Sequence, residues 1–194
     1  RRVIKRYLTQ HAHGSVETND FYQAFQDALG ITPDWFFEQW IYRGGEPRYA
    51  VTFEDAVVQG ASGRQSSFLV RQIHEVDELV RLFRMPIVFE VHYTDGSAER
   101  VRGWVAKETE RIIVPNPKSK PVAFVLFDPG GHLLKNVTFD KPLKMLTAQA
   151  LGAPQMIDRY DAIVLLRTAD LTAKRDVLLQ AYGREAFFGI KAEI

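Results

Sequence analysis

Residues 31–47 read ITPDWFFEQWIYRGGEP, and this stretch determines how the chain divides. Four aromatic residues fall within little more than one helical turn, namely Trp35, Phe36, Phe37 and Trp40. The diglycine Gly44-Gly45 then ends the helical pattern, and Pro47 prevents its continuation. The stretch therefore predicts a helix that closes one part of the chain and a different kind of structure after it.

The start of this short helix has the expected signals. Thr32 is an N-cap candidate, Pro33 suits the first helical position, and Asp34 adds a negative charge where the helix dipole favours it. A helix this short is unstable alone. We expect its aromatic side chains to bury against a larger body, because two short helices upstream cannot supply enough surface.

The preceding residues also predict helices. Val3, Ile4, Tyr7 and Leu8 recur at helical spacing, and Gly14 is a candidate stop for that helix. A second helix is expected from an N-cap at Thr18, with Asp20 in its first turn and Gly30 at its end. Its apolar face comprises Phe21, Phe25, Ala28 and Leu29.

Residues 47–140 change to a period of two, which is typical of strands. Residues 87–93 alternate, and Asp95-Gly96 predicts a hairpin with a primed turn into residues 101–105. A second hairpin is expected between residues 122–127 and 132–139, joined by a turn at Asp128-Pro129-Gly130-Gly131. About seven short strands are expected in all, which favours a β-sandwich. Residues 74–84 fit a helical turn as well as a loop.

Residues 141–194 return to helical patterns in short segments, which suggests the start of an ARM- or HEAT-like helical repeat. The predicted fold class is thus a multi-domain α and β protein. Its expected parts are a helical N-terminal stub at 1–46, an antiparallel β-sandwich of about seven strands at 47–140, and partial helical repeats at 141–194. Because the first segment begins like the middle of a helix, we interpret the chain as part of a longer protein.

Composition limits the classes of function. The chain is 46% hydrophobic and 25% charged, so it can form a real core. Its formal net charge of +1 would not attract nucleic acid or an anionic membrane, and its lack of cysteine excludes disulfides and thiolate chemistry. No apolar run approaches the roughly 18 to 20 residues of a membrane span. We expect a soluble protein of the bacterial cytoplasm or periplasm.

The histidines do not predict a catalytic or metal site. His11 and His13 would point in opposite directions on a helix and cannot share a metal there. His74 begins His-Glu-x-x-Glu, which resembles a metal motif, but Glu78 replaces the second histidine and the surroundings are predicted to be strands. His92 and His132 are interpreted as surface residues on a strand and at a turn.

Other candidate features are also weak. Asn136-Val137-Thr138 fits a glycosylation sequon, and the loop Lys118-Ser119-Lys120 is basic, but neither indicates a site. The glycine pairs form no phosphate-binding loop, and no Gly-x-Ser-x-Gly elbow occurs. We therefore predict no catalytic, cofactor-binding or metal-ligating residue in this chain.

The order of these zones resembles the C-terminal part of the M1-family zinc aminopeptidases, the gluzincins. The resemblance is carried by RYLTQHAHGSVETNDFYQAF, WFFEQWIYRGGEP, FRMPIVFEVHYTDG, DRYDAIVLL and FFGIKAEI. The family's aromatic-rich segment corresponds to Phe36-Phe37, Gln39-Trp40, Tyr42, Gly44-Gly45 and Pro47. Two patterns of its helical repeat domain correspond to Arg159, Ala162 and Leu165, and to Phe188, Gly189, Ile190, Lys191, Ala192 and Glu193.

The resemblance implies a parent enzyme that removes N-terminal amino acids from peptides by zinc-assisted hydrolysis. It also implies that the GxMEN motif, the zinc-binding HExxH and the transition-state tyrosine lie upstream, since none is present here, and Tyr7 takes no catalytic role. The 194 residues are then expected to be inactive and to bind no zinc. They would pack on the catalytic domain through Trp35, Phe36 and Trp40 and wall the active-site chamber.

The sequence leaves two alternatives open. The sandwich could be an interaction or carbohydrate-binding module, with Tyr93 and Trp104 as candidate sugar platforms. The parent could also be a catalytically dead relative that serves only as a scaffold.

Overall fold

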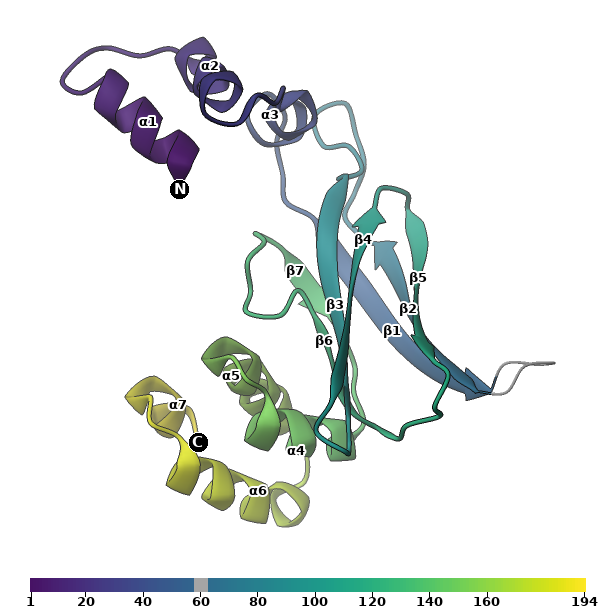
Figure 1. Ribbon diagram of the computed structural model, residues 1–194. Coiled ribbons are helices and arrows are strands. Elements are labelled where there is room, and N and C mark those ends of the chain that lie inside the picture. The colour runs from purple at the N-terminus through teal and green to yellow at the C-terminus, as the bar shows by residue number, and fades with distance from the viewer. Residues whose placement is uncertain (58–62) are drawn as a thin grey trace. The chain divides into compact units, whose positions relative to one another are not determined.

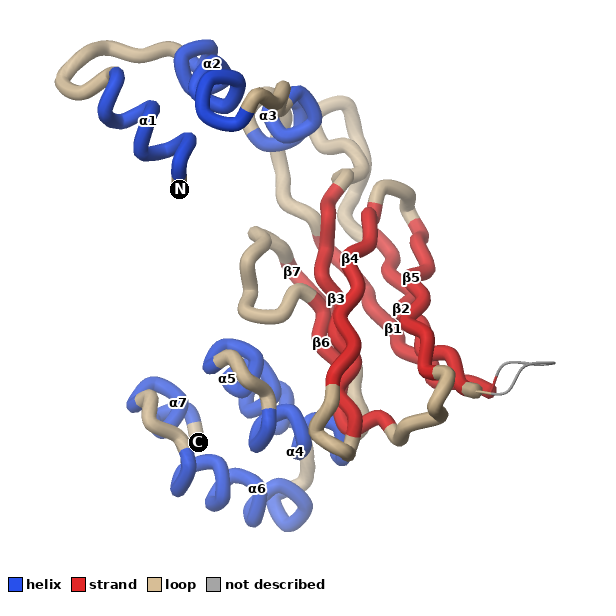
Figure 2. Tube along the Cα trace, in the orientation of Figure 1, coloured by secondary structure: helices blue, strands red, loops and turns tan. Residues whose placement is uncertain are grey.

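The computed structural model describes residues 1–57 and 63–194, and this part of the chain forms a mixed α and β protein with two compact units. The first unit comprises residues 1–45 and 75–81, and the second comprises residues 46–74 and 82–194. Figure 2 shows helices at both ends of the sequence and strands between them. This is the predicted fold class, whereas the boundaries at 46/47 and 140/141 stay predictions.

The first unit contains α1 (Arg2–Gln10), α2 (Thr18–Leu29) and α3 (Asp34–Trp40). Helix α1 ends before Gly14, at its C-cap His11. Helix α2 starts one residue earlier than predicted, because Glu17 is its N-cap and the Asp20 carboxylate accepts the Glu17 backbone N–H at 2.8 Å. Gly30 ends α2, as predicted, and it has the left-handed conformation.

Phe37 is the centre of an aromatic cluster in the first unit and is 1% exposed. Its ring centroid lies 5.8 Å from Phe21, 5.2 Å from Tyr22 and 6.0 Å from Phe25, all on α2. The prediction that short helices cannot bury this aromatic run is therefore wrong for Phe37. Trp35 differs, since it is 36% exposed.

Residues 75–81 form a loop that is held by hydrogen bonds between its own residues. Asp77 Oδ1 accepts the backbone N–H groups of Leu79 and Val80 at 2.8 and 2.7 Å. A Cβ atom on Gly45, whose φ is +83°, would lie 2.9 Å from the Val80 methyl groups. The second glycine of the diglycine thus permits the chain both to turn and to contact this loop.

The second unit contains a β-sandwich of two sheets (Figure 1). One sheet has the order β5-β2-β1-β7, and the other has the order β4-β3-β6. The strands are β1 (Arg48–Val57), β2 (Arg64–Gln72), β3 (Met85–Tyr93), β4 (Ala98–Val105), β5 (Thr109–Asn116), β6 (Val122–Phe127) and β7 (Asn136–Thr138). Phe68 of β2 and Phe89 of β3 are fully buried between the sheets, with ring centroids 5.0 Å apart.

The first predicted hairpin is confirmed, since β3 and β4 pair antiparallel. Its turn is different from the prediction, because among its residues only Gly96 has a positive φ, of +84°. Gly96 N–H donates to the Tyr93 carbonyl at 3.1 Å, and Tyr93 N–H donates to the Ser97 carbonyl at 2.9 Å. The turn is therefore a longer connection with one left-handed glycine instead of a two-residue primed turn.

The second predicted hairpin is wrong. Strand β6 pairs with β3 in one sheet, whereas β7 pairs parallel with β1 in the other. Asp128 has a φ of +53°, and its buried carboxylate accepts the Leu133 N–H at 2.9 Å and Lys135 Nζ at 2.5 Å. These contacts hold residues 128–135 as a compact loop that carries the chain from one sheet to the other.

Helices follow the sandwich in the second unit: α4 (Leu143–Gly152), α5 (Met156–Leu165), the short 3₁₀ helix η1 (Leu166–Thr168), α6 (Leu171–Arg184) and α7 (Phe188–Glu193). Their shared core includes Leu146, Ala162, Leu166 and Ile190. Phe124 and Leu126 of β6 pack with Ala153, just after α4, and this contact joins the helices to the sandwich. Within the described residues, no helix is long and apolar enough to cross a membrane.

Candidate functional site

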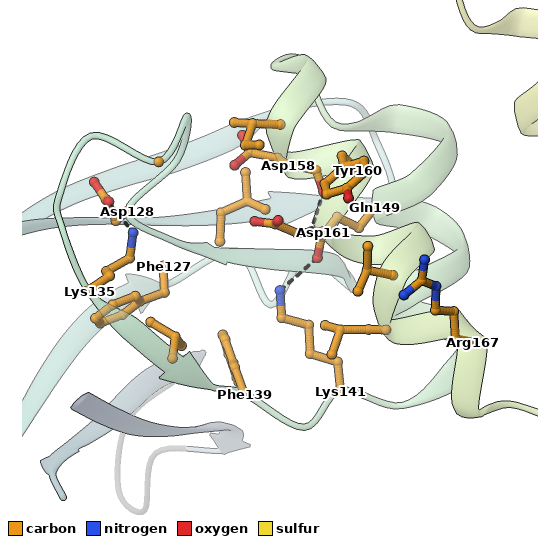
Figure 3. Close-up of a pocket in the computed structure, with 16 residues that line it drawn as sticks. Phe127, Asp128, Lys135, Phe139, Lys141, Gln149, Asp158, Tyr160, Asp161 and Arg167 are labelled. Carbon is orange, nitrogen blue, oxygen red and sulfur yellow. Dashed lines mark hydrogen bonds and ion pairs between the residues drawn. The ribbon is translucent and has the colours of Figure 1, made fainter. Parts of the chain in front are cut away.

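A cavity in the second unit lies beside β6, the 128–135 loop and α5 (Figure 3). Its volume is about 490 Å³. Six acidic or basic side chains line it: Asp128, Lys135, Lys141, Asp158, Asp161 and Arg167. The remaining walls are largely apolar and include Phe127, Phe139 and Val164. Such a cavity has the size and the mixed lining of a small-molecule site.

Two carboxylates come from one face of α5, since Asp158 and Asp161 are separated by three residues. Asp158 is 5% exposed, and its Oδ1 accepts the Gly130 N–H at 2.9 Å. Its Oδ2 is buried and has no hydrogen-bond partner among residues 1–57 and 63–194. Burial raises the pKa of both Asp158 and Asp161.

Lys141 is held by neutral groups at the other side of this cavity. Its Nζ donates to the Val125 carbonyl at 2.8 Å. It also donates to Gln149 Oε1 at 2.7 Å, and Gln149 Nε2 donates to the Asp158 carbonyl at 2.7 Å (Figure 3). Burial lowers the pKa of Lys141 to about 8, against the opposing charges of Asp161 and Asp158. The geometry thus connects β6, α4 and α5 through one chain of hydrogen bonds.

The residues singled out in the sequence do not gather at this cavity. His11 is the C-cap of α1, and His13 follows it with a φ of +64°. His74 packs edge-on against Phe83 with ring centroids 5.3 Å apart. Residues 75–78 are not helical, so the spacing of His-Glu-x-x-Glu does not place His74 and Glu78 on one helix face. Among the described residues, no group of three or more His, Asp or Glu side chains could hold a metal ion.

His92 is not the surface residue that the alternation predicts. Its side chain is 13% exposed, its ring stacks on Phe124 at 4.3 Å with an angle of 12°, and Nε2 lies 2.9 Å from Glu90 Oε2. The polar face of β3 is covered here because Phe124, on the neighbouring strand, packs with the start of the helical region. His132, by contrast, is exposed at its turn.

The remaining candidates have structural partners. Lys120 Nζ lies 2.9 Å from Asp95 Oδ2, and Asn136 Nδ2 donates to Glu46. Tyr93 is 4% exposed and faces the sandwich core, whereas Trp104 is 44% exposed and carries the Arg84 guanidinium 4.8 Å from its ring. The two aromatic rings therefore do not form a shared sugar platform.

Comparison with known proteins gives a fold and no family. No protein-family model matches the chain, and no curated protein matches it. A solved structure that matches is aminopeptidase A of Legionella pneumophila in complex with aspartic acid, with 13% identity and a TM-score of 0.63. The match covers 97% of this chain and 21% of that chain. This chain thus spans about one fifth of the length of that aminopeptidase and resembles that part of it in fold.

Proposed function

We propose that this chain is a non-catalytic segment of an M1-type zinc metalloaminopeptidase, which removes N-terminal amino acids from peptides. It would provide scaffold and walls for the active-site chamber of the parent enzyme. The observation that carries this proposal is the likeness of fold to an aminopeptidase over 97% of the chain. The order of the motifs in the sequence supports it independently, because those motifs follow the succession seen in the family.

Exposed apolar side chains in the first unit support docking on a further body. Ile4 and Leu8 lie one helical turn apart on α1 and are 55% and 61% exposed, and Ile41, after α3, is 42% exposed. Apolar side chains on one helix face are the usual signature of a packed interface. We propose that this body is the parent's catalytic domain and that Trp35, Phe36 and Trp40 contact it.

The helices after the sandwich offer a second apolar face. Leu179 and Tyr182 lie three residues apart on α6 and are 61% and 52% exposed, and Phe188 of α7 is 78% exposed. Each unit of a helical repeat buries its apolar face against the next unit. We propose that further helices of the parent cover these residues and continue the array.

Zinc would be bound elsewhere in the parent enzyme. The described residues do not fit the metal, since they lack a cluster of side chains that could ligate it. We therefore derive no step of peptide hydrolysis for this chain. Its contribution would be to hold the catalytic domain and to limit which substrates reach it.

The proposal is tested on the isolated chain and on the longer parent. The 194 residues should contain no stoichiometric zinc after dialysis and should not cleave leucine p-nitroanilide. The parent should retain zinc and should cleave this substrate. In the parent, Trp35→Ala should lower the midpoint of thermal unfolding and the rate of hydrolysis. Trp104→Ala, which removes a 44% exposed tryptophan from the sandwich, is the matched control. Tight zinc with turnover by the isolated chain would contradict the proposal, and a parent without zinc or activity would favour a dead scaffold.

A further inference from the structure

The cavity beside β6 and α5 has no role in the proposed function. Its residues come from separate parts of the sequence: β6, the 128–135 loop, Lys141, α4 and α5. Its volume of about 490 Å³ lies within the range of about 300–1,000 Å³ that small-molecule sites occupy. It is therefore a candidate for a ligand site of its own.

Asp158 provides an acceptor without a donor inside this cavity. The side chain is 5% exposed and is fixed by the Gly130 N–H on Oδ1, while Oδ2 has no partner among the described residues. Buried carboxylate oxygens in native proteins nearly always accept a hydrogen bond, because leaving one without a donor is costly. A ligand that donates to Oδ2 would satisfy this atom.

The charges that line the cavity indicate whether the ligand should be positively or negatively charged. Lys135 forms an ion pair with Asp128, and Arg167 forms one with Glu193, so these four charges cancel. Lys141 bonds two neutral oxygens, and neither Asp158 nor Asp161 forms an ion pair within the residues that the structure describes. With both aspartates ionised, Lys141, Asp158 and Asp161 together carry one negative charge.

The residues that line the cavity further restrict the chemical class of the ligand. No cluster of three metal-ligating side chains occurs in the described residues, so the lining favours an organic cation over a metal ion. A primary ammonium group carries one positive charge and three N–H donors. Phe127, Phe139 and Val164 would surround an apolar body attached to it.

From this geometry we propose that the cavity binds a small primary amine with an apolar body. Its ammonium group donates to Asp158 Oδ2 and is neutralised by Asp158 and Asp161. Burial raises the pKa of both carboxyl groups although the charge of Lys141 opposes this shift, and a bound ammonium group would oppose it further. The site is separate from peptide hydrolysis and does not depend on the proposed function.

Calorimetric titration of the 194-residue chain with phenethylamine tests this proposal. We expect saturable binding with a stoichiometry of one, and binding of 2-phenylethanol at least about tenfold weaker, because the alcohol has the same body without the charge. Equal binding of the two compounds, or no saturable binding of the amine, would overturn the proposal.

Variants assign the binding to the cavity. Asp158→Asn keeps an oxygen for the Gly130 N–H but removes the charge, so phenethylamine should bind at least about tenfold more weakly. Asp176→Asn makes the same change on the exposed side of α6 and should leave binding unaltered. Val164→Phe should abolish binding by filling the cavity, with the fold of each variant checked by circular dichroism. Wild-type affinity in Asp158→Asn, or in a folded Val164→Phe protein, would show that the amine binds elsewhere.

Discussion

Phe68 and Phe89 meet between the two sheets of the sandwich, with ring centroids 5.0 Å apart and both side chains fully buried. Phe68→Ala should lower the free energy of unfolding by about 3–5 kcal/mol, because a buried aromatic ring is replaced by a cavity. Ile113 lies on β5 and is 46% exposed, so Ile113→Ala should lower the free energy of unfolding by less than about 1 kcal/mol. Denaturant unfolding followed by fluorescence checks both values, and similar losses in the two variants would contradict this packing.

Gly103 permits a close approach between the sheets. A Cβ atom at this position would lie 2.5 Å from Cδ1 of Ile112, a residue of the opposing sheet. We expect Gly103→Ala to destabilise the protein by about 1–3 kcal/mol through overpacking. Combining it with Ile112→Ala should cost less than the sum of the two single changes, because the shorter side chain makes room. Strict additivity in a double-mutant cycle would exclude this contact.

Arg159 and Glu185 join α5 to the end of α6 by two hydrogen bonds, of 2.7 and 3.1 Å. The bonds from Arg159 lower the pKa of Glu185 to about 2 from its ordinary value of 4.5. A carboxyl group with a lowered folded-state pKa stabilises the protein above its unfolded pKa, and this stability is lost as the pH falls toward the folded value. The advantage of the wild type over Glu185→Gln should therefore shrink between about pH 4.5 and 2.

Thermal unfolding of both proteins across this pH range provides the measurement. Asp176→Asn is the control, since its exposed carboxylate has no ion pair within the described residues. A constant difference between the wild type and Glu185→Gln down to pH 2 would contradict the role of the Arg159 pair.

Asp128 holds the loop that separates β6 from β7. Asp128→Asn should be tolerated better than Asp128→Ala, because asparagine accepts a positive φ and keeps an oxygen for the Leu133 N–H. Both variants leave Lys135, whose side chain is 12% exposed, without its carboxylate, but alanine also loses the acceptor for the Leu133 N–H, and we expect it to cost about 3 kcal/mol. Equal unfolding free energies for the two variants would show that the side-chain oxygen at position 128 does not hold the loop through the Leu133 N–H.

Local sequence patterns predicted those helices and strands whose formation is encoded within the segment itself. The alternation of residues 87–93 gave β3, and the aromatic run before the diglycine gave α3 within one residue of its start. Strand β6 was also expected, but its partner was not. The pairing of β7 with β1 involves only three residues of each strand, which lie almost ninety positions apart, and no local pattern encodes such a pairing.

The cavity was missed for a related reason. Asp158 and Asp161 stand three residues apart on a helix and look like an ordinary solvated face in the sequence. Asp158 is buried because Gly130, from a loop that precedes it by 28 residues, covers it and donates to it. The burial of His92 against Phe124 is similar, since it depends on a neighbouring strand and on the helices beyond it.

Sequencing the coding region that precedes Arg1 tests the central claim most directly. The proposal predicts an open reading frame that continues upstream and encodes His-Glu-x-x-His followed by a spaced glutamate. An upstream region that encodes no such motif, or a frame that begins at this chain, would contradict the assignment to a zinc aminopeptidase.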